Sequence, residues 1–367
     1  MRLFKRILAV LFGLLALAVV SLAIAISYDG SCRSPEAIAA GAQRMKAVVF
    51  RCYGSPDVLK VEEVAKPTPK DDELLVKVHA AAVNPLDWHY MRGEPYVMRL
   101  SSGIGAPKDI RSGVDFAGTV EAVGKDVTRF KAGDEVFGGR SGALAEYITI
   151  RETSAVVHKP ANVSFEQAAA VPIAGVTALQ ALRDMGQLKV GQKVLINGAS
   201  GGVGTFAVQI AKSLGAEVTG VCSTRNVELI RSLGADHVID YTKQDFTEGT
   251  EKYDIIVDNI GNHPLRKAAR VLKPSGIFVI VGAKSDDPWL GPAWQPVKAA
   301  LLDPTVDQKF AMILARLDAA DLGVIAGLMQ AGKVASVIDR SYPLAQAANA
   351  MAYLEEGRAR GKVIVVP

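Results

Sequence analysis

Cysteine is scarce in this chain, and the scarcity argues against two kinds of site. The three cysteines, Cys32, Cys52 and Cys222, lie far apart in the sequence, form no CxxC pair and do not cluster with histidine. Neither a zinc lobe nor a disulfide framework is therefore expected. Cys222 ends a predicted buried strand, where we expect an inert thiol.

The chain also lacks a large excess of positive or negative charge. The net charge is +4, aromatic residues make up 6% of the chain, and no run of Lys or Arg alternates with aromatic residues. A protein that stacks on bases and follows a phosphate backbone carries a basic, aromatic-rich surface. We therefore expect no nucleic-acid partner, and we expect the charges to lie on solvated faces.

One long hydrophobic run is present near the N-terminus. Residues 7–26 carry no charge, follow the basic residues of segment 1–6 (Arg2, Lys5 and Arg6), and would span about 30 Å as a helix. The apolar region of a secretory signal is usually about 7–15 residues long, and no small-x-small cleavage site closes this run. We favour an uncleaved single-pass transmembrane anchor at 7–26, followed by a polar linker at 27–45. A start at Met45 is an alternative, because the sequence after it reads as the beginning of a globular domain.

The body of the chain divides into two patterns. From 46 to 165, short strand signals separated by Gly, Pro and Asp predict a β-rich, partly closed barrel. From 166 to 310 an apolar helix (165–186) leads into alternating strands and helices, which predicts an α/β domain with a parallel sheet covered on both faces. The expected strands are 194–197, 218–222, 237–240, 255–258 and 277–281, and the expected helices are 205–214, 227–233 and 264–272.

Two later segments depart from that alternation. Residues 286–309, with Trp289 and Trp294, break the rhythm and read as a cap over the site or an interface, with a packing role favoured. Residues 311–367 return to strand, helix and strand, which could rejoin the first domain.

Glycines mark the junction between the first strand and the first helix of the α/β domain. The strand "VLIN" runs into Gly198, Gly201, Gly202 and Gly204 and then directly into a helix. Glycines at such a junction permit a tight turn, let backbone N–H groups approach a pyrophosphate, and let helix and strand pack closely. The pattern predicts a dinucleotide cofactor.

The residues after the second strand indicate which dinucleotide. Ser223, Thr224 and Arg225 stand where an NAD-binding chain usually carries an Asp or Glu. No carboxylate there repels a 2′-phosphate, and a guanidinium can bind one through two hydrogen bonds. We expect NADPH rather than NADH; the alternative is that Arg225 is an ordinary surface cation.

Several motifs together resemble one protein family. "GQKVLINGASGGVGTFAVQIAK", "NPLDWHYMRG", "GVDFAGTVEAVG", "GDEVFG", "GALAEY" and "PIAGVTAL" follow the order and spacing of the quinone oxidoreductases of the medium-chain dehydrogenase/reductase superfamily. The resemblance covers residues 46–367. It implies a GroES-like catalytic domain built from both ends of the body, an inserted Rossmann domain, and an active site in the cleft between them.

The resemblance also implies cofactor contacts at individual positions. They are Gly201, Gly202 and Val203 at the pyrophosphate, Ser223, Arg225 and Tyr241 at the adenosine phosphate, and Thr177, Asn259 and Gly282 toward the nicotinamide. Lys362 is a weaker candidate, because a lysine there can equally be a solvated strand end.

Zinc-dependent relatives differ from this chain at the metal site. They place Cys where this chain has Asn84, and a His-Glu pair where it has Val114 and Asp115. For Asp115 we expect structural hydrogen bonds instead. Asn and Val cannot supply the nitrogen and sulfur ligands that zinc needs. His79, His158, His237 and His263 show no ligand spacing either. The resemblance therefore implies the zinc-free branch, with no metal ligands.

A site without a metal has no Lewis acid to polarise a carbonyl. It relies on holding the nicotinamide against an acceptor that is already electrophilic, an alignment worth roughly 7–11 kcal/mol. Asn84 is the expected polar anchor in the cleft, or else a turn residue before Pro85. Tyr90 or His89 is the expected proton donor, although Trp88 and Tyr90 could also simply wall the pocket.

These observations favour a membrane-anchored, NADPH-dependent reductase of quinones or α,β-unsaturated carbonyls. The alternatives are an enoyl-thioester reductase, an alcohol dehydrogenase-like enzyme, and an NADPH-binding sensor or scaffold. The anchor suggests lipid-soluble substrates, and the family is often homodimeric. The side of the membrane stays open, because the basic N-terminus favours a body outside the cytoplasm whereas NADPH is abundant in the cytosol.

Overall fold

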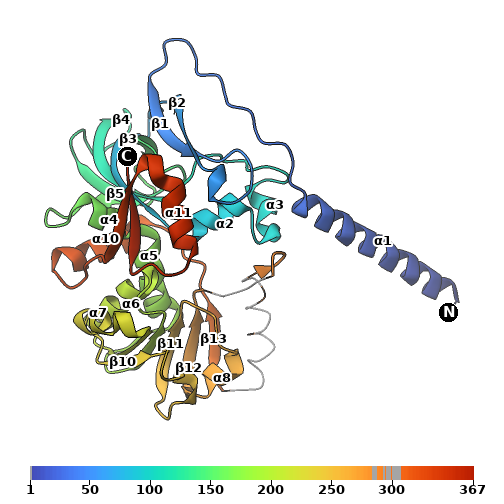
Figure 1. The fold of residues 1–367 in the computed structure, drawn as a ribbon, viewed down its shortest axis with the longest axis vertical. Coiled ribbons are helices and arrows are strands. Elements are labelled where there is room, and N and C mark those ends of the chain that lie inside the picture. Colours follow the sequence, from blue (N-terminus) through green and yellow to red (C-terminus); the bar gives the residue numbers. More distant parts are fainter. Residues whose placement is uncertain (1, 283–286, 292–293, 295–298, 300–306) are drawn as a thin grey trace.

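The computed structural model describes residues 2–282, 287–291, 294, 299 and 307–367. These residues form two sheet-based domains from which one long helix projects (Figure 1). The helices are α1 (Arg2–Ser27), α2 (Pro85–Arg92), α3 (Arg99–Ser102), α4 (Phe165–Ala169), α5 (Pro172–Gln180), α6 (Gly202–Ser213), α7 (Val227–Ser232), α8 (Leu265–Ala269), α10 (Ala319–Gln330) and α11 (Ala347–Glu355).

The first domain is built around a seven-stranded sheet of order β14-β15-β3-β4-β5-β7, with β6 also paired to β3. Its strands are β3 (Glu73–Val83), β4 (Asp115–Val123), β5 (Glu135–Gly139), β6 (Tyr147–Arg151), β7 (Val156–His158), β14 (Ile338–Pro343) and β15 (Lys362–Val366). The central strand β3 is buried along most of its length, because strands and helices cover it on both sides. A separate hairpin of β1 (Arg44–Val49) and β2 (Lys60–Ala65) lies beside this sheet.

The C-terminal strand closes this first domain. β15 pairs antiparallel with β3 (Val363 opposite Val83) and parallel with β14. The red C-terminal elements consequently lie against the blue and green N-terminal ones in Figure 1. The domain is therefore assembled from segments on both sides of the inserted domain.

The second domain contains a parallel six-stranded sheet of order β10-β9-β8-β11-β12-β13. Its strands are β8 (Lys193–Asn197), β9 (Glu217–Cys222), β10 (His237–Asp240), β11 (Tyr253–Asp258), β12 (Leu272–Ile280) and β13 (Lys309–Met312). The predicted α/β class and parallel sheet are confirmed. The last strand, β13, was not predicted, because its short sequence lies at the end of the segment that breaks the alternation.

The sequence predicted a single helix at 165–186, and this prediction is wrong. The stretch forms α4 and α5, and α5 continues into a π-helical turn that ends at Met185. Pro172 is the first residue of α5, where its missing N–H and fixed φ angle start a helix more readily than they continue one. The break lets α4 pack on the first sheet while α5 packs on α6.

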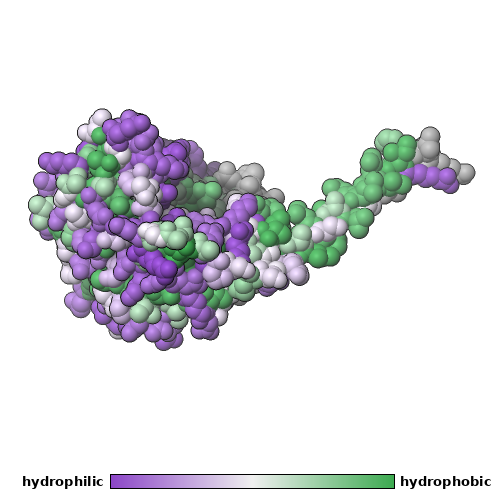
Figure 2. Space-filling view, turned by 90° about the horizontal axis from the view of Figure 1, so that it is seen from above, coloured by the Kyte–Doolittle hydropathy of each residue, from purple (hydrophilic) through white to green (hydrophobic). Residues whose placement is uncertain are grey.

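The helix α1 extends away from the two domains, with its apolar side chains exposed (Figure 2). By length and composition it is the helix in the described part of the chain that could cross a membrane. Most of segment 286–309, read from the sequence as a cap or interface, lies outside the described residues. The longest described stretch of it, 287–291, packs on segment 96–97: Tyr96 N donates to the Pro288 carbonyl at 2.7 Å, and Val97 N donates to the Trp289 carbonyl at 3.1 Å.

The expectation that the cysteines form no disulfide is wrong. Cys32 and Cys52 are bonded, because the segment after α1 folds back along the end of β1 and the amide of Arg33 donates to the carbonyl of Arg51 at 3.0 Å. The cysteines are 20 residues apart, so their spacing alone did not reveal the pairing. Cys222 is buried as predicted, and burial raises the pKa of its thiol to about 11, which keeps it protonated and unreactive.

Candidate active site

The two domains meet where the C-terminal strand β15 passes the turn that contains Gly198, Gly201, Gly202 and Gly204, which we call the glycine turn. Gly361 forms an isolated parallel bridge with Gly201, and its amide donates to the carbonyl of Ser200 at 2.9 Å. The next side chain, Lys362, consequently lies over Gly202: a methyl group added at Gly202 would be 3.1 Å from Lys362 Cδ. The first turn of α6 and the start of β15, the last strand of the first domain, are thus in direct contact.

Lys362 ends in a buried polar cluster. Its Nζ donates to Asn84 Oδ1 at 2.5 Å and to Asp115 Oδ2 at 3.2 Å, with the side chains of Lys362 and Asp115 only 4% and 0% exposed. The alternative interpretation of Lys362 as a solvated strand end is therefore wrong. A buried ammonium is tolerable only because the carboxylate and the amide oxygen replace its water.

Asn84 is held by the same cluster. Its Nδ2 donates to Asp115 Oδ2 at 3.0 Å while its Oδ1 accepts from Lys362, and these partners fix the orientation of the amide because an ammonium only donates and a carboxylate only accepts. The side chain is buried and both of its polar groups have protein partners. Asn84 is also the N-cap residue of α2, which agrees with the alternative of a turn residue before Pro85, while its role as a polar anchor in the cleft stays a prediction.

Asp115 joins the cluster to the second domain's leading helices. Its Oδ1 accepts from the amide of Ile173 at 3.0 Å, in the first turn of α5, where helical N–H groups lack partners within the helix. Burial raises the pKa of Asp115, and the positive charge of Lys362 opposes that rise. The structural hydrogen bonds expected for Asp115 are present, and they link β4, α5 and β15.

A second buried acid, Asp87, escaped the sequence analysis. Its Oδ2 accepts from the amide of Asn84 at 2.7 Å, as the third helical residue often does for the N-cap. Burial, and then the nearby charge of Asp115, raise the pKa of Asp87 to about 7. The Asn-x-x-Asp spacing at a helix start could have identified the hydrogen bond, but nothing local indicated the burial.

Asp87 and Tyr90 line a cavity of about 370 Å³. Its other lining residues are Phe50, Leu86, Ser101, Ser102, Pro107, Lys108, Asp109, Arg111, Ser112, Gly113, Val114 and Ser141. The volume is within the range of small-molecule sites. Because Val114 precedes Asp115 and Leu86 precedes Asp87, the cavity borders the Lys362 cluster.

The two candidate proton donors are placed differently. Tyr90 lines the cavity and is 39% exposed. His89 stacks on Trp88 with ring centroids 3.7 Å apart, and its Nδ1 lies 2.7 Å from the carbonyl of Glu94. Burial lowers the pKa of His89. The structure thus brings Tyr90, but not His89, to the cavity wall.

The glycine turn has the geometry that a pyrophosphate requires. Gly198 has φ +75°, and a methyl group at Gly204 would lie 2.2 Å from the carbonyl oxygen of Gly198, so both positions need glycine for the protein's own packing. At Gly201 the nearest atom to an added methyl group is 3.6 Å away, which leaves room for a ligand. Gly202 and Val203 begin α6, where backbone N–H groups are free to bind an anion.

The ends of β9 and β10 bring together the residues expected at the adenosine phosphate. Ser223 and Tyr241 follow the paired residues Cys222 and Asp240, and the side chain of Tyr241 is exposed. Arg225 Nη2 donates to the carbonyl of Arg358 at 2.7 Å, which orients its guanidinium. Asp240 turns its carboxylate to Thr224 and Thr242, and the hydroxyl of Thr224 is the main cause of its lowered pKa of about 2.

Two buried oxygens on this edge have no hydrogen-bond partner among the described residues: Asn226 Oδ1 and Asn259 Oδ1. Asn226 Nδ2 donates to Ser200 Oγ at 2.9 Å, and Asn259 Nδ2 donates to the carbonyl of Asn197 at 2.9 Å. Buried oxygens without a donor are costly, and the hydroxyl and amide groups of a dinucleotide are donors. The residues present therefore fit such a cofactor.

The remaining positions expected near the nicotinamide lie on two elements. Thr177 is buried in α5, and Gly282 follows β12. A methyl group at Gly282 would lie 2.1 Å from the carbonyl oxygen of Asn259, so Gly282 allows these two segments to touch. In the part of the chain that the structure describes, no three His, Cys, Asp or Glu side chains are grouped as metal ligands.

Comparison with known proteins identifies the family. Residues 70–161 match the alcohol dehydrogenase GroES-like domain, and residues 233–365 match the family described as zinc-binding dehydrogenase. The chain is 34% identical over 341 residues to an NADPH-dependent alkenal/one oxidoreductase of Arabidopsis thaliana, covering 89% of this chain and 80% of the relative. It is 35% identical over 340 residues to the chloroplast envelope quinone oxidoreductase homolog of the same plant, covering 88% of this chain and 98% of the relative.

A solved structure agrees with these relatives. The quinone oxidoreductase from Coxiella burnetii is 29% identical and superposes with a TM-score of 0.78, covering 89% of this chain and all (100%) of that chain. Glycine turn, fold and relatives agree on the cofactor and on the reaction class. The chain belongs to the zinc-independent, quinone-oxidoreductase-like branch of the medium-chain dehydrogenase/reductase family and is an NADPH-dependent oxidoreductase.

Proposed function

We propose that this enzyme reduces quinones or α,β-unsaturated carbonyls at the cavity beside Tyr90, and that α1 anchors it in a membrane. The observation that carries the proposal is the cavity, which is lined by Tyr90, by Asp87 and by Val114, the residue before the buried Asp115 of the Lys362 cluster. When bound, NADPH supplies the hydride. The protein supplies alignment, positive charge and a proton.

Lys362 holds its positive charge beside the first turn of α6. Asn84 and Asp115 keep the ammonium in place and leave it buried next to Gly202. An ammonium in a site shielded from water attracts a phosphate more strongly than one in solvent. We therefore assign Lys362 to cofactor binding, with Asn84 as a positioning residue, because both polar groups of its amide are already engaged.

Tyr90 is the proposed proton donor. Hydride addition to a conjugated carbonyl leaves a negative charge on the oxygen, and a hydroxyl at the cavity wall can protonate it. The partial exposure of Tyr90 lets solvent return the proton. His89 is bonded to the loop at Glu94 and is assigned a structural role. The other cofactor contacts expected from the sequence are proposed as they stand: Thr177, Gly198, Gly201, Gly202, Val203, Gly204, Ser223, Arg225, Tyr241, Asn259 and Gly282.

The N-terminal helix is proposed to be an uncleaved anchor. Organelle transit peptides are amphipathic and rich in arginine, whereas residues 7–26 carry no charge. The segment after the helix is bonded to the body through Cys32 and Cys52. Disulfides persist in oxidising compartments, and a basic N-terminus stays cytoplasmic. Both observations favour a body outside the cytoplasm, although cofactor supply favours the opposite side. The homodimer common in the family stays a prediction.

The side of the membrane can be tested with a C-terminal fusion. Alkaline phosphatase joined after Pro367 folds only in an oxidising compartment, so we expect active fusions and an oxidised Cys32–Cys52 pair in cells. An inactive fusion with both thiols free would place the body in the cytoplasm.

The reaction is tested with the full-length protein in detergent. NADPH and NADH are each compared against a short quinone, an enone and a simple aldehyde. We expect NADPH oxidation with the first two acceptors only. Tyr90→Phe should lower kcat at least about a hundredfold, the lower range for a general acid, while His89→Gln should leave it nearly unchanged. Turnover of the aldehyde alone, or loss of activity in His89→Gln but not Tyr90→Phe, would contradict the proposal.

A further inference from the structure

The junction between α1 and the body is rigid. Arg99, buried in α3, pairs with the carboxylate of Asp29 at 2.8 Å, and its Nη1 also donates to the carbonyl of Tyr28 at 3.3 Å. The amide of Gly30 donates to the carbonyl of Gly105 at 2.8 Å. With the disulfide at Cys32, these bonds hold residues 28–33, the strap, against the body.

The side chain of Arg99 is also held by contacts with residues of the body. Its guanidinium lies over the rings of Tyr53 and Tyr96, at 4.4 and 4.8 Å from their centroids, and its Nε donates to the carbonyl of Gly93 at 2.8 Å. A buried guanidinium with this many partners cannot move without exposing unpaired donors. The contacts of Arg99 therefore hold the residues that directly follow α1 against the body.

Exposed apolar residues lie near the C-terminal end of α1, at Ser27. They are Tyr28, Leu100, Ile104 and Trp289, which are 64%, 49%, 54% and 41% exposed. We call these four residues the collar.

The bonds of the strap place three collar residues beside the C-terminal end of α1, and Trp289 joins them through η2. Tyr28 directly follows α1, Leu100 follows Arg99, and Ile104 precedes Gly105. The ring of Trp289 packs edge-on against Tyr96 in η2 (Tyr96–Met98), which also contacts α1. Figure 2 shows apolar surface continuing from the helix onto the adjoining part of the body.

We propose that the collar lies in the headgroup layer of the bilayer that α1 crosses, so that the body rests on the lipid surface in one orientation. A residue that directly follows a spanning helix lies at the interface, where Tyr and Trp are enriched. Because the strap prevents the body from swinging away, Leu100 and Ile104 meet lipid at the same depth. The occupant of this apolar surface is the membrane itself.

The same segment forms the rim of the cavity. The cavity is lined by Ser101 and Ser102, which lie between the collar residues Leu100 and Ile104 in the sequence, and by Pro107 and Lys108, which follow Ile104. The collar thus presents the cavity to substrates dissolved in the bilayer, such as long-tailed quinones. The position of the collar rests on the membrane anchor proposed for α1, and this consequence rests on the proposed reaction as well.

The position of the collar is tested by spin-label depth measurements on the full-length protein in phosphatidylcholine–phosphatidylglycerol vesicles. Ile104→Cys provides the label site, because Cys222 is buried and the other two cysteines are bonded. Val190→Cys is the matched control, since Val190 is an exposed apolar residue (83%) in the other domain. We expect the label at 104 to collide readily with oxygen and poorly with a water-soluble nickel chelate, and the label at 190 to do the reverse. Equal access of the chelate to both labels would overturn the proposal.

Turnover in the same vesicles tests the consequence for substrate. In the double variant Leu100→Ser and Ile104→Ser, KM for a long-tailed, membrane-embedded quinone should rise about tenfold, while KM for a short water-soluble quinone stays unchanged. Equal effects on both quinones would overturn the link between collar and cavity. If the wild-type protein reduces neither quinone, the proposed function fails, and the depth measurement still decides the position of the collar.

Discussion

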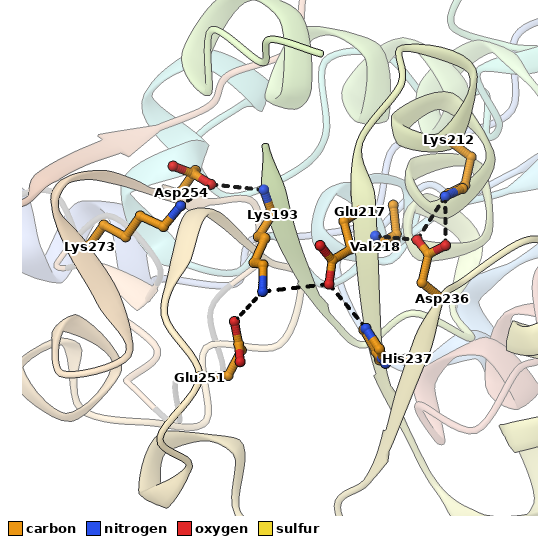
Figure 3. Close-up of polar contacts among 9 residues, drawn as sticks. All are labelled: Lys193, Lys212, Glu217, Val218, Asp236, His237, Glu251, Asp254 and Lys273. Carbon is orange, nitrogen blue, oxygen red and sulfur yellow. Dashed lines mark hydrogen bonds and ion pairs between the residues drawn. The ribbon is translucent and has the colours of Figure 1, made fainter. Parts of the chain in front are cut away.

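The two edges of the parallel sheet in the second domain differ sharply in chemistry. At the amino ends of the strands, Lys193 pairs with Glu251 and Glu217, at 2.5 and 3.6 Å, and His237 Nε2 lies 3.1 Å from Glu217 (Figure 3). At the carboxyl ends stand Gly198, Ser223, Tyr241 and Asn259, with open space at Gly201 and two amide oxygens that have no partner in the part of the chain that the structure describes. Exposed ion pairs such as those of Lys193 stabilise little, whereas the opposite edge has the features of a cofactor-binding edge.

Two buried acids of the first domain titrate in the opposite direction from an exposed acid at the amino edge. Hydrogen bonding to Lys193 lowers the pKa of Glu251 at the amino edge. On the site side, burial raises the pKa of Asp115 and raises that of Asp87 to about 7. The chain therefore leaves the site side less stable than it could be, which is common where residues serve a reaction.

The largest effect is expected from removing the buried ammonium. Lys362→Met should lower the free energy of unfolding by about 3–5 kcal/mol, because it leaves Asp115 buried without its partner. Denaturant unfolding of the full-length protein in detergent measures the loss. Lys193→Met, at the amino edge, is the matched control. A loss in Lys362→Met no larger than that of the control would show that Lys362 is not energetically buried.

Asp87→Asn should make stability less dependent on pH. The folded-state pKa of Asp87, about 7, lies above that of an unfolded Asp, so its contribution is complete below the unfolded pKa and is lost as pH rises to the folded pKa. Relative to wild type, the variant should gain roughly 2–3 kcal/mol between pH 5 and pH 8. Parallel stability curves for the two proteins over that range would refute the raised pKa.

Gly201→Ala should separate ligand binding from folding. The added methyl group has space in the protein but occupies the room left for the pyrophosphate, so NADPH affinity should fall about a hundredfold, or about 2.7 kcal/mol, with the thermal midpoint unchanged. Calorimetric titration measures the affinity. Gly323→Ala, in α10 with nothing near its added methyl group, should leave the affinity unchanged and raise the thermal midpoint slightly, because alanine favours a helix more than glycine does. Unchanged affinity in Gly201→Ala would mean that the cofactor does not approach this turn.

Arg225→Ala should change which dinucleotide is preferred. Loss of the guanidinium should weaken NADPH binding about tenfold, or about 1.4 kcal/mol, and leave NADH binding as it is. The ratio of the two dissociation constants gives the result. An unchanged ratio would show that specificity lies elsewhere.

The smallest effect is expected at the amino edge. Lys193→Met removes exposed ion pairs, so the thermal midpoint should move by no more than about 2 °C and NADPH affinity should stay constant. A clear loss of NADPH affinity in this variant would undo the contrast between the two edges.

The sequence predicted what depends on neighbouring residues. Five of the six parallel strands were found, with bounds within about five residues, because buried strands read as continuous apolar runs between helical periods. The glycine turn was visible because all of its residues lie within one strand-to-helix junction. Pro172 shows the limit of that approach, since the stretch looked like one helix, whereas α4 packs on the first sheet and α5 packs on α6.

Contacts between distant segments were beyond the reach of such patterns. Lys362 and Asn84 are 278 residues apart, and Lys362 and Asp115 are 247 apart, so nothing local tells a buried partner from a solvated strand end. The same holds for the Cys32–Cys52 bond and for the ion pair of Arg99 with Asp29.

By itself, the amino-acid sequence determined the α/β class, the dinucleotide turn, the absence of an acid after β9 and the apolar run at the N-terminus, because each is a property of adjacent residues. Only the tertiary structure decided which charges are buried, which amides are occupied, where Tyr90 faces and how α1 joins the body. Burial and pairing depend on atoms that meet only after the chain has folded, and these set the pKa of Asp87 and the position of the ammonium of Lys362.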